Sequence, residues 1–110
     1  MKCLHIITPV KDSIDSTLET VKAIMESDIL VPFTYTVYND FSTEENTHRL
    51  EEAARQWNFR LVNLSDLTDH PSPNYLLVLQ TAQKEAIEAD AGLLIVESDV
   101  IVKKNTLQSL

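Results

Sequence analysis

The stretch 91–102, AGLLIVESDVIV, constrains the fold of this chain more than any other. Four apolar residues at 93–96 run directly into Glu97, Ser98 and Asp99, after which apolar residues resume. An unbroken apolar run of this length is typical of a strand that is covered on both faces, as in a parallel α/β sheet. Because side chains alternate along an extended chain, Glu97 and Asp99 are expected to point to the same side and to be able to bind one cation together.

The rest of the chain alternates between strand-like and helix-like patterns. Apolar and β-branched runs predict strands at 3–10, 35–38, 59–64 and 93–96. Apolar residues at helical spacing predict helices at 14–27, 46–57 and 75–89, with Ser13 as the first N-cap. The buried stripe of the third helix is expected to contain Tyr75, Leu79, Ala82 and Ala86, and a last short helix is expected at 106–110. This alternating order predicts an α/β fold with a mostly parallel sheet of about four strands.

Parallel strands end at a common edge of the sheet, and that edge is the candidate site. Polar residues follow all the predicted strands there, at 9–12, 39–42, 65–66 and 97–99. The sequence therefore predicts a ligand site built from several strand ends rather than from one motif.

The charge of the chain limits what this edge can bind. Asp and Glu number 17 against 9 Lys and Arg, which gives a formal net charge of −8. This balance argues against nucleic acid bound by a broad basic face. The single glycine, Gly92, excludes a Gly-rich phosphate loop, which needs several glycines. A small anionic ligand would need a divalent cation, held by carboxylates, to neutralise it.

The chain of 110 residues has the length of one domain, and its composition is that of a globular protein. No stretch approaches the roughly 18 to 20 apolar residues that span a bilayer, and the start lacks the length of a secretory signal. The single cysteine, Cys3, cannot form an internal disulfide and is expected to pack as a small hydrophobe. We therefore expect a cytoplasmic protein, free or at the cytoplasmic face of the membrane, with no transmembrane segment in this chain.

Three segments together resemble the amino-terminal half of a family-2 glycosyltransferase of the GT-A fold. They are ITPVKD at 7–12, TVYNDFSTEENT at 36–47 and LLIVESDVIVKKNTL at 93–107. That family typically has a proline at the end of its first strand, Asp-Asp-Gly-Ser after its second, and Asp-x-Asp closing a later apolar strand. The resemblance covers essentially the whole chain, and it implies a Rossmann-like sheet that binds a nucleotide-diphosphate sugar, with a UDP-sugar as the expected donor.

The resemblance also implies roles for six residues. Pro9 and Val10 would lie beside the nucleotide base, Asp40 would accept hydrogen bonds from the base edge, and Ser42 would lie nearby. Glu97 takes the place of the first acid of Asp-x-Asp, which faces the ribose or the metal shell, and Asp99 takes the place of the last, which binds the metal. The metal, Mn²⁺ or Mg²⁺, would bridge the diphosphate of the donor.

Three residues depart from the family pattern. Asn39 stands where the family has the first Asp after its second strand, Phe41 replaces the Gly, and Glu97 replaces an Asp. In the family the catalytic base and most of the acceptor site follow the metal motif, but this chain ends eleven residues after Asp99. Residues 1–110 are therefore expected to be the nucleotide-binding part of a truncated domain, inactive by itself, and no catalytic residue is assigned.

Two other functions fit the pattern of strands and carboxylates. A receiver-like signalling module would hold Mg²⁺ beside a phosphorylatable Asp, although here Thr8, Pro9 and Val10 stand where acids would be expected. A non-catalytic structural fragment would use an exposed sheet edge to pair with a partner or with another copy.

Overall fold

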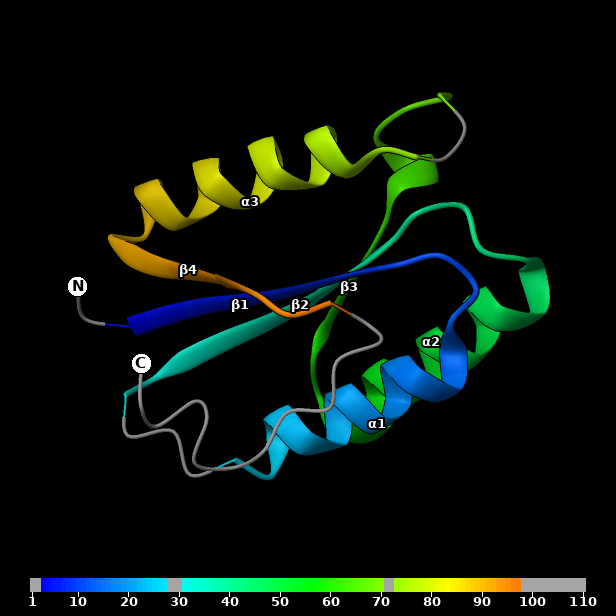
Figure 1. Ribbon diagram of the computed structural model, residues 1–110, viewed down its shortest axis with the longest axis horizontal. Coiled ribbons are helices and arrows are strands. Elements are labelled where there is room, and N and C mark those ends of the chain that lie inside the picture. Colours follow the sequence, from blue (N-terminus) through cyan, green and yellow to red (C-terminus); the bar gives the residue numbers. More distant parts are fainter. Residues whose placement is uncertain (1–2, 28–30, 71–72, 98–110) are drawn as a thin grey trace.

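A four-stranded parallel sheet forms the centre of the computed structural model, which describes residues 3–27, 31–70 and 73–97 (Figure 1). The strands are β1 (Cys3–Val10), β2 (Phe33–Asn39), β3 (Arg60–Asn63) and β4 (Ala91–Ile95). The helices are α1 (Ile14–Met25), α2 (Glu44–Trp57) and α3 (Tyr75–Glu88), with a short 3₁₀ turn, η1 (Leu64–Asp66). Helices α1 and α2 cover one face of the sheet and α3 the other. The expected α/β fold is confirmed.

The order of the strands is β3-β2-β1-β4, and every pair is parallel. This is the order of one half of a Rossmann fold, in which β1 lies between β2 and β4. In a receiver-like domain, by contrast, the first strand lies between the second and the third. The topology therefore contradicts the receiver-like alternative.

Strand and helix ends differ from the sequence prediction by a few residues. The first strand has the predicted bounds, whereas β2 and β4 each begin two residues earlier than expected. Helix α2 begins at Glu44 because Thr43 caps it, with its Oγ1 accepting a bond of 3.3 Å from the N–H of Asn46. The predicted helix at 106–110 lies outside the described residues.

The core consists of one apolar cluster on each face of the sheet. On the face covered by α1 and α2, the cluster contains residues of β1, β2 and both helices, among them Ile6, Val10, Val21, Val37 and Leu50. On the other face, α3 packs on the sheet through Val78 and Ala82, together with Ile7, Tyr38 and Leu64. These two clusters fix the sheet between its helical layers.

The predicted buried stripe of α3 is partly wrong. The buried residues are Val78, Ala82 and Ala86, whereas Tyr75 is 45% exposed. The helix faces the sheet with Val78 and Ala82, and its N-cap, Asn74, bonds to Asp40 at the carboxyl ends of the strands. As a result, Tyr75 lies at the edge of the sheet rather than in the core.

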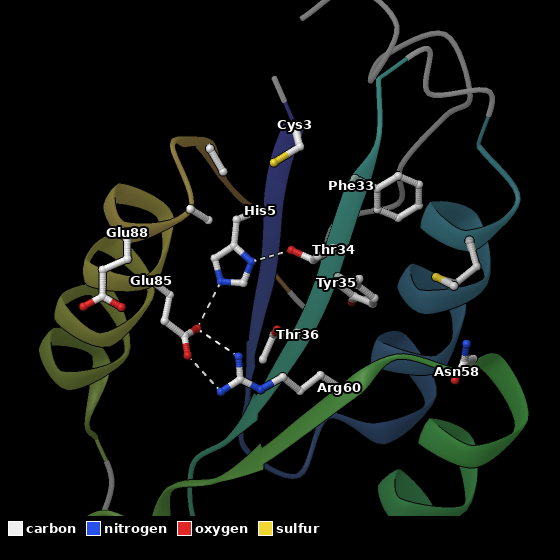
Figure 2. A pocket seen from close by; sticks show the side chains of 13 residues that line it. Cys3, His5, Phe33, Thr34, Tyr35, Thr36, Asn58, Arg60, Glu85 and Glu88 are labelled. Atoms are coloured by element: carbon white, nitrogen blue, oxygen red, sulfur yellow. Dashed lines mark hydrogen bonds and ion pairs between the residues drawn. The ribbon is translucent and has the colours of Figure 1, made fainter. Parts of the chain in front are cut away.

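A network around Glu85 docks α3 on three strands (Figure 2). The Glu85 carboxylate accepts two bonds from the Arg60 guanidinium, at 3.1 and 2.8 Å, and one of 3.2 Å from the Tyr38 hydroxyl. His5 places Nε2 3.3 Å from Glu85 and Nδ1 2.8 Å from the Thr34 hydroxyl. Because an ionised carboxylate only accepts, the neutral His5 carries its proton on Nε2 and accepts at Nδ1.

Burial favours the neutral form of His5, whereas the network favours the charged form of Glu85. Burial lowers the pKa of His5 below its ordinary value, and this effect outweighs the attraction of Glu85, which raises it. The hydrogen bond from Arg60 lowers the pKa of Glu85. The two groups therefore make stability depend on pH in separate ranges.

We predict that stability falls as the pH drops below neutrality because of His5. The unfolded chain binds a proton at His5 near its ordinary pKa of 6.5, whereas the folded protein binds it only at a lower pH. The stabilisation is therefore present above 6.5 and is lost as the pH falls through the folded pKa. Urea unfolding between about pH 7.5 and about pH 5 should show this slope, and His5→Gln should flatten it.

His48→Gln is the matched control, because His48 lies on the exposed face of α2. This variant should keep the wild-type slope. An unchanged slope in His5→Gln would contradict the prediction.

Candidate functional site

The carboxyl ends of all four strands meet at one edge, on the right of Figure 1, as the sequence predicted. The loops that follow β1 and β2 lead there into α1 and α2, and the segment after β3 leads into α3. Ligands of open α/β sheets bind at this edge.

Asp12 ties the loop after β1 to the loop after β2. Its backbone N–H donates to the Ser42 Oγ at 2.8 Å, and its Oδ1 accepts from the Thr43 N–H at 2.7 Å and from the Asn46 side chain at 3.0 Å. The bonds from Asn46 and Thr43 lower the pKa of Asp12. Asp12 has a left-handed backbone with φ of 61°, which Asp tolerates better than most residues. These contacts hold Ser42 in place.

The buried Asn39 joins three elements through its side-chain amide. Its Nδ2 donates to the Thr47 Oγ1 at 2.8 Å and to the Asn63 Oδ1 at 2.9 Å, and its Oδ1 accepts from the Ser42 N–H at 3.2 Å. An aspartate, the family residue, would have no donor to offer Asn63. The departure from the family pattern at Asn39 therefore has a structural reason.

Asp40 is buried, with 8% of its surface exposed, and it is held by the start of α3. The Asn74 backbone N–H donates to Oδ2 at 2.8 Å, and the Asn74 side-chain Nδ2 donates to Oδ1 at 2.9 Å. The backbone N–H of Asp40 donates to the Val10 carbonyl at 2.7 Å. A carboxylate has about four acceptor positions, so pairing with Asn74 is compatible with a further donor from a ligand.

Phe41 adopts a left-handed backbone, with φ of 61°, at the position where the family has glycine. Such a conformation costs a bulky residue about 1 to 3 kcal/mol. The half-buried Phe41 side chain packs against the α3-side apolar cluster, which offsets this cost. The loop thus keeps a backbone typical of glycine without having one.

Pro9 and Val10 border the site differently. Pro9 lies within β1 opposite Tyr38. By strand alternation its nitrogen, which carries no hydrogen, faces the β4 side of β1. It lies beyond Ile95, the last residue of β4 that pairs with β1. The Val10 side chain is buried in the core with 2% exposure, so only its backbone faces the edge.

Glu97 is exposed and is the last residue that the structure describes, while Asp99 lies outside the described residues. The Tyr75 hydroxyl donates to the Glu97 Oε1 at 3.2 Å. Within the described ranges, no three His, Cys, Asp or Glu side chains lie close enough to hold a metal ion. Glu97 thus fits a cation that takes one or two carboxylates and completes its shell with phosphate oxygens.

The sequence reasoning missed three residues that shape this edge. Asp12 was placed at the edge without a role, and Asn74 and Tyr75 were assigned to a loop and to a core stripe. Pro73 directly before Asn74 is a signal that could have marked the helix start.

A concavity lies at the opposite end of the sheet, by the amino-terminal ends of the strands. This groove of about 760 Å³ includes His5, Thr34, Arg60 and Glu85 in its lining (Figure 2). Since these side chains pair with one another to dock α3, the groove is explained by that network. It contains none of the predicted site residues.

The comparison with known proteins adds evidence about the fold. No protein-family model matches the chain, and no curated protein matches it. Residues 1–349 of TarS from S. aureus match 99% of this chain with 22% identity and a TM-score of 0.65. Structures of the same TarS segment in complex with UDP-GlcNAc and with UDP match with 24% and 23% identity and a TM-score of 0.64.

The likeness establishes the fold. The strand order and the TM-score of 0.65 agree, so the expected Rossmann-like, mostly parallel α/β architecture is the one found. This chain spans about a third of the matched TarS segment, at 31% and 30% of its length.

We predict that Asn39→Asp destabilises the protein although it restores the family residue. The substitution removes the donor to Asn63 and buries a charge, at a cost of about 1 to 3 kcal/mol in the free energy of unfolding. Urea unfolding of the variant measures this loss. Asn58→Asp makes the same change at an exposed position and should cost much less; equal costs for the two variants would contradict the role assigned to Asn39.

Proposed function

We propose that this chain is the nucleotide-sugar-binding part of a family-2 glycosyltransferase that uses a UDP-sugar. The observation that carries the proposal is the shared fold over 99% of the chain with TarS structures, two of which contain UDP-GlcNAc or UDP. In the described part of the chain, the motifs that resemble the family reach the carboxyl ends of β1, β2 and β4, where such a ligand would bind.

Asp40 is proposed to accept hydrogen bonds from the base edge, with Pro9 and the Val10 backbone beside the base and Ser42 nearby. The burial of Asp40 and its two bonds from Asn74 support this role, because they hold a charged acceptor in one orientation. Ser42 is held by Asp12 and Asn39.

Glu97 and Asp99 are proposed to hold Mn²⁺ or Mg²⁺ together with the donor diphosphate. When bound, the ion would neutralise the diphosphate and stabilise the charge of the leaving nucleotide. The net charge of −8 supports this assignment, because the chain has few cations to spare for a diphosphate. The acceptor, the catalytic base and transfer activity itself are not assigned to residues of this chain.

We predict that UDP binds this protein in a metal-dependent manner. Calorimetric titration of UDP with Mn²⁺ should give heat of binding that falls strongly when the metal is chelated. Asp99→Ala should abolish the metal dependence while leaving the fold intact, because it removes a proposed metal ligand.

Glu19→Ala removes an exposed acid of α1 and is the control, expected to bind as wild type does. Absence of UDP binding by folded wild-type protein would contradict the proposal, and binding of GDP instead would mean that the base is wrong. Metal-dependent binding that survives in Asp99→Ala would contradict the metal assignment alone.

Self-association through the outer strand β4, at the side of the sheet, is a further part of the proposal. The Val96 N–H donates to Ile7 of β1, so strand alternation places the N–H groups of Ala91, Leu93 and Ile95 on the outer edge of β4. Residues 91–95 contain no charge and no proline, the features that usually protect an edge.

We predict that the sedimentation coefficient rises with protein concentration. Ala91→Pro should suppress the rise, because it removes an outward N–H at the first residue of the strand, where proline is tolerated. A coefficient that is constant with concentration in the wild type would contradict this edge contact.

The location of the protein stays a prediction. No helix in the described part of the chain is long and apolar enough to cross a membrane. A cytoplasmic protein, free or at the inner membrane face, is the proposal that follows from the expected donor.

A further inference from the structure

The N-cap and the first residue of α3 contact two acids of the proposed site, Asp40 and Glu97. Asn74 donates to Asp40 at 2.8 and 2.9 Å, and its neighbour Tyr75 donates to Glu97 at 3.2 Å. Asp40 follows β2 and Glu97 follows β4, and these two strands are separated in the sheet by β1. The start of α3 therefore bridges two strand ends that are not neighbours.

We infer that Asn74 and Tyr75 are positioning residues of the nucleotide-sugar site, an inference that rests on the function proposed above. Asn74 orients the acid assigned to the base, and Tyr75 orients the acid assigned to the ribose and metal side. Because the two residues are consecutive in the chain, a displacement of α3 moves both contacts.

The contacts of Asn74 fix the orientation of its amide. One Nδ2 hydrogen reaches Asp40 and the other reaches the His70 carbonyl at 2.9 Å, so both donors are directed at acceptors. Asn74 and Asp40 are each only 8% exposed. A buried carboxylate is costly unless it is hydrogen-bonded, so the position of Asp40 depends strongly on Asn74.

The contact of Tyr75 is weaker. Tyr75 is 45% exposed and Glu97 is also exposed, so water competes for both groups. Loss of this hydroxyl should affect only the orientation of Glu97, whereas loss of the Asn74 amide should affect the base side of the site. The two substitutions are therefore expected to affect different parts of UDP binding, and by different amounts.

Titration of UDP into the full chain, with Mn²⁺ and with the metal chelated, tests the inference. Asn74→Ala should weaken UDP binding by about tenfold in both conditions, as expected for loss of a hydrogen bond to a charged group. Tyr75→Phe should reduce only the gain in affinity that Mn²⁺ provides, by about threefold. General damage to the fold would weaken binding in both conditions for both variants.

Tyr38→Phe is the matched control, because it removes a tyrosine hydroxyl from the Glu85 network instead. It should leave the gain from Mn²⁺ unchanged. Circular dichroism and urea unfolding establish that each variant is folded.

An exchange of Asp40 and Asn74 separates pairing from base recognition. Asp40→Asn places two amides together, and Asn74→Asp places two carboxylates together. The double variant restores one amide–carboxylate pair. We expect the double variant to recover most of the stability that the single changes lose, while UDP binding stays weak because the charge has moved. Strictly additive losses of stability would overturn the pairing.

The outcomes distinguish this inference from the proposed function. If folded wild-type protein binds no UDP in either condition, the proposed function fails and the inference fails with it. If the wild type binds UDP and both Asn74→Ala and Tyr75→Phe bind as it does, the inference alone is overturned.

Discussion

The position of β1 between β2 and β4 is the constraint on which the site depends. The register pairs Val10 with Asn39, so the chain leaves both strands at the same level. The Asp40 N–H then bonds to the Val10 carbonyl, which extends the pairing by one residue. A slip by one residue would turn Asp40 to the other face of the sheet. The candidate site therefore exists because the central strand is paired on both sides.

Neutral amides hold this edge together in an acidic protein. Asn39 links β2 to β3 and α2, and Asn74 anchors Asp40. An amide can donate and accept at once, so it satisfies buried polar groups without adding to the net charge of −8. The departure from the family at Asn39 is consistent with this chemistry.

Helix α3 is anchored at two points far apart along its length. Its N-cap, Asn74, bonds to Asp40 at the carboxyl ends of the strands, and Glu85 bonds to Arg60 and Tyr38, with His5 beside it, toward the amino-terminal ends. Between them, small and branched side chains such as Ala82 pack on the sheet. The Glu85 network thus holds the carboxyl-terminal half of α3 on the sheet, away from the proposed site.

The sequence by itself determined the α/β class, the number of strands and the edge at which the polar residues gather, because the spacing of apolar residues follows the local period of strands and helices. Only the tertiary structure decided which polar groups meet there. Asp12 and Ser42 are 30 residues apart, and Asp40 and Asn74 are 34 apart, so no local pattern relates them. The predicted buried stripe of α3 is wrong at Tyr75 for the same reason, since the face of α3 that is buried depends on its packing against strands distant in the sequence.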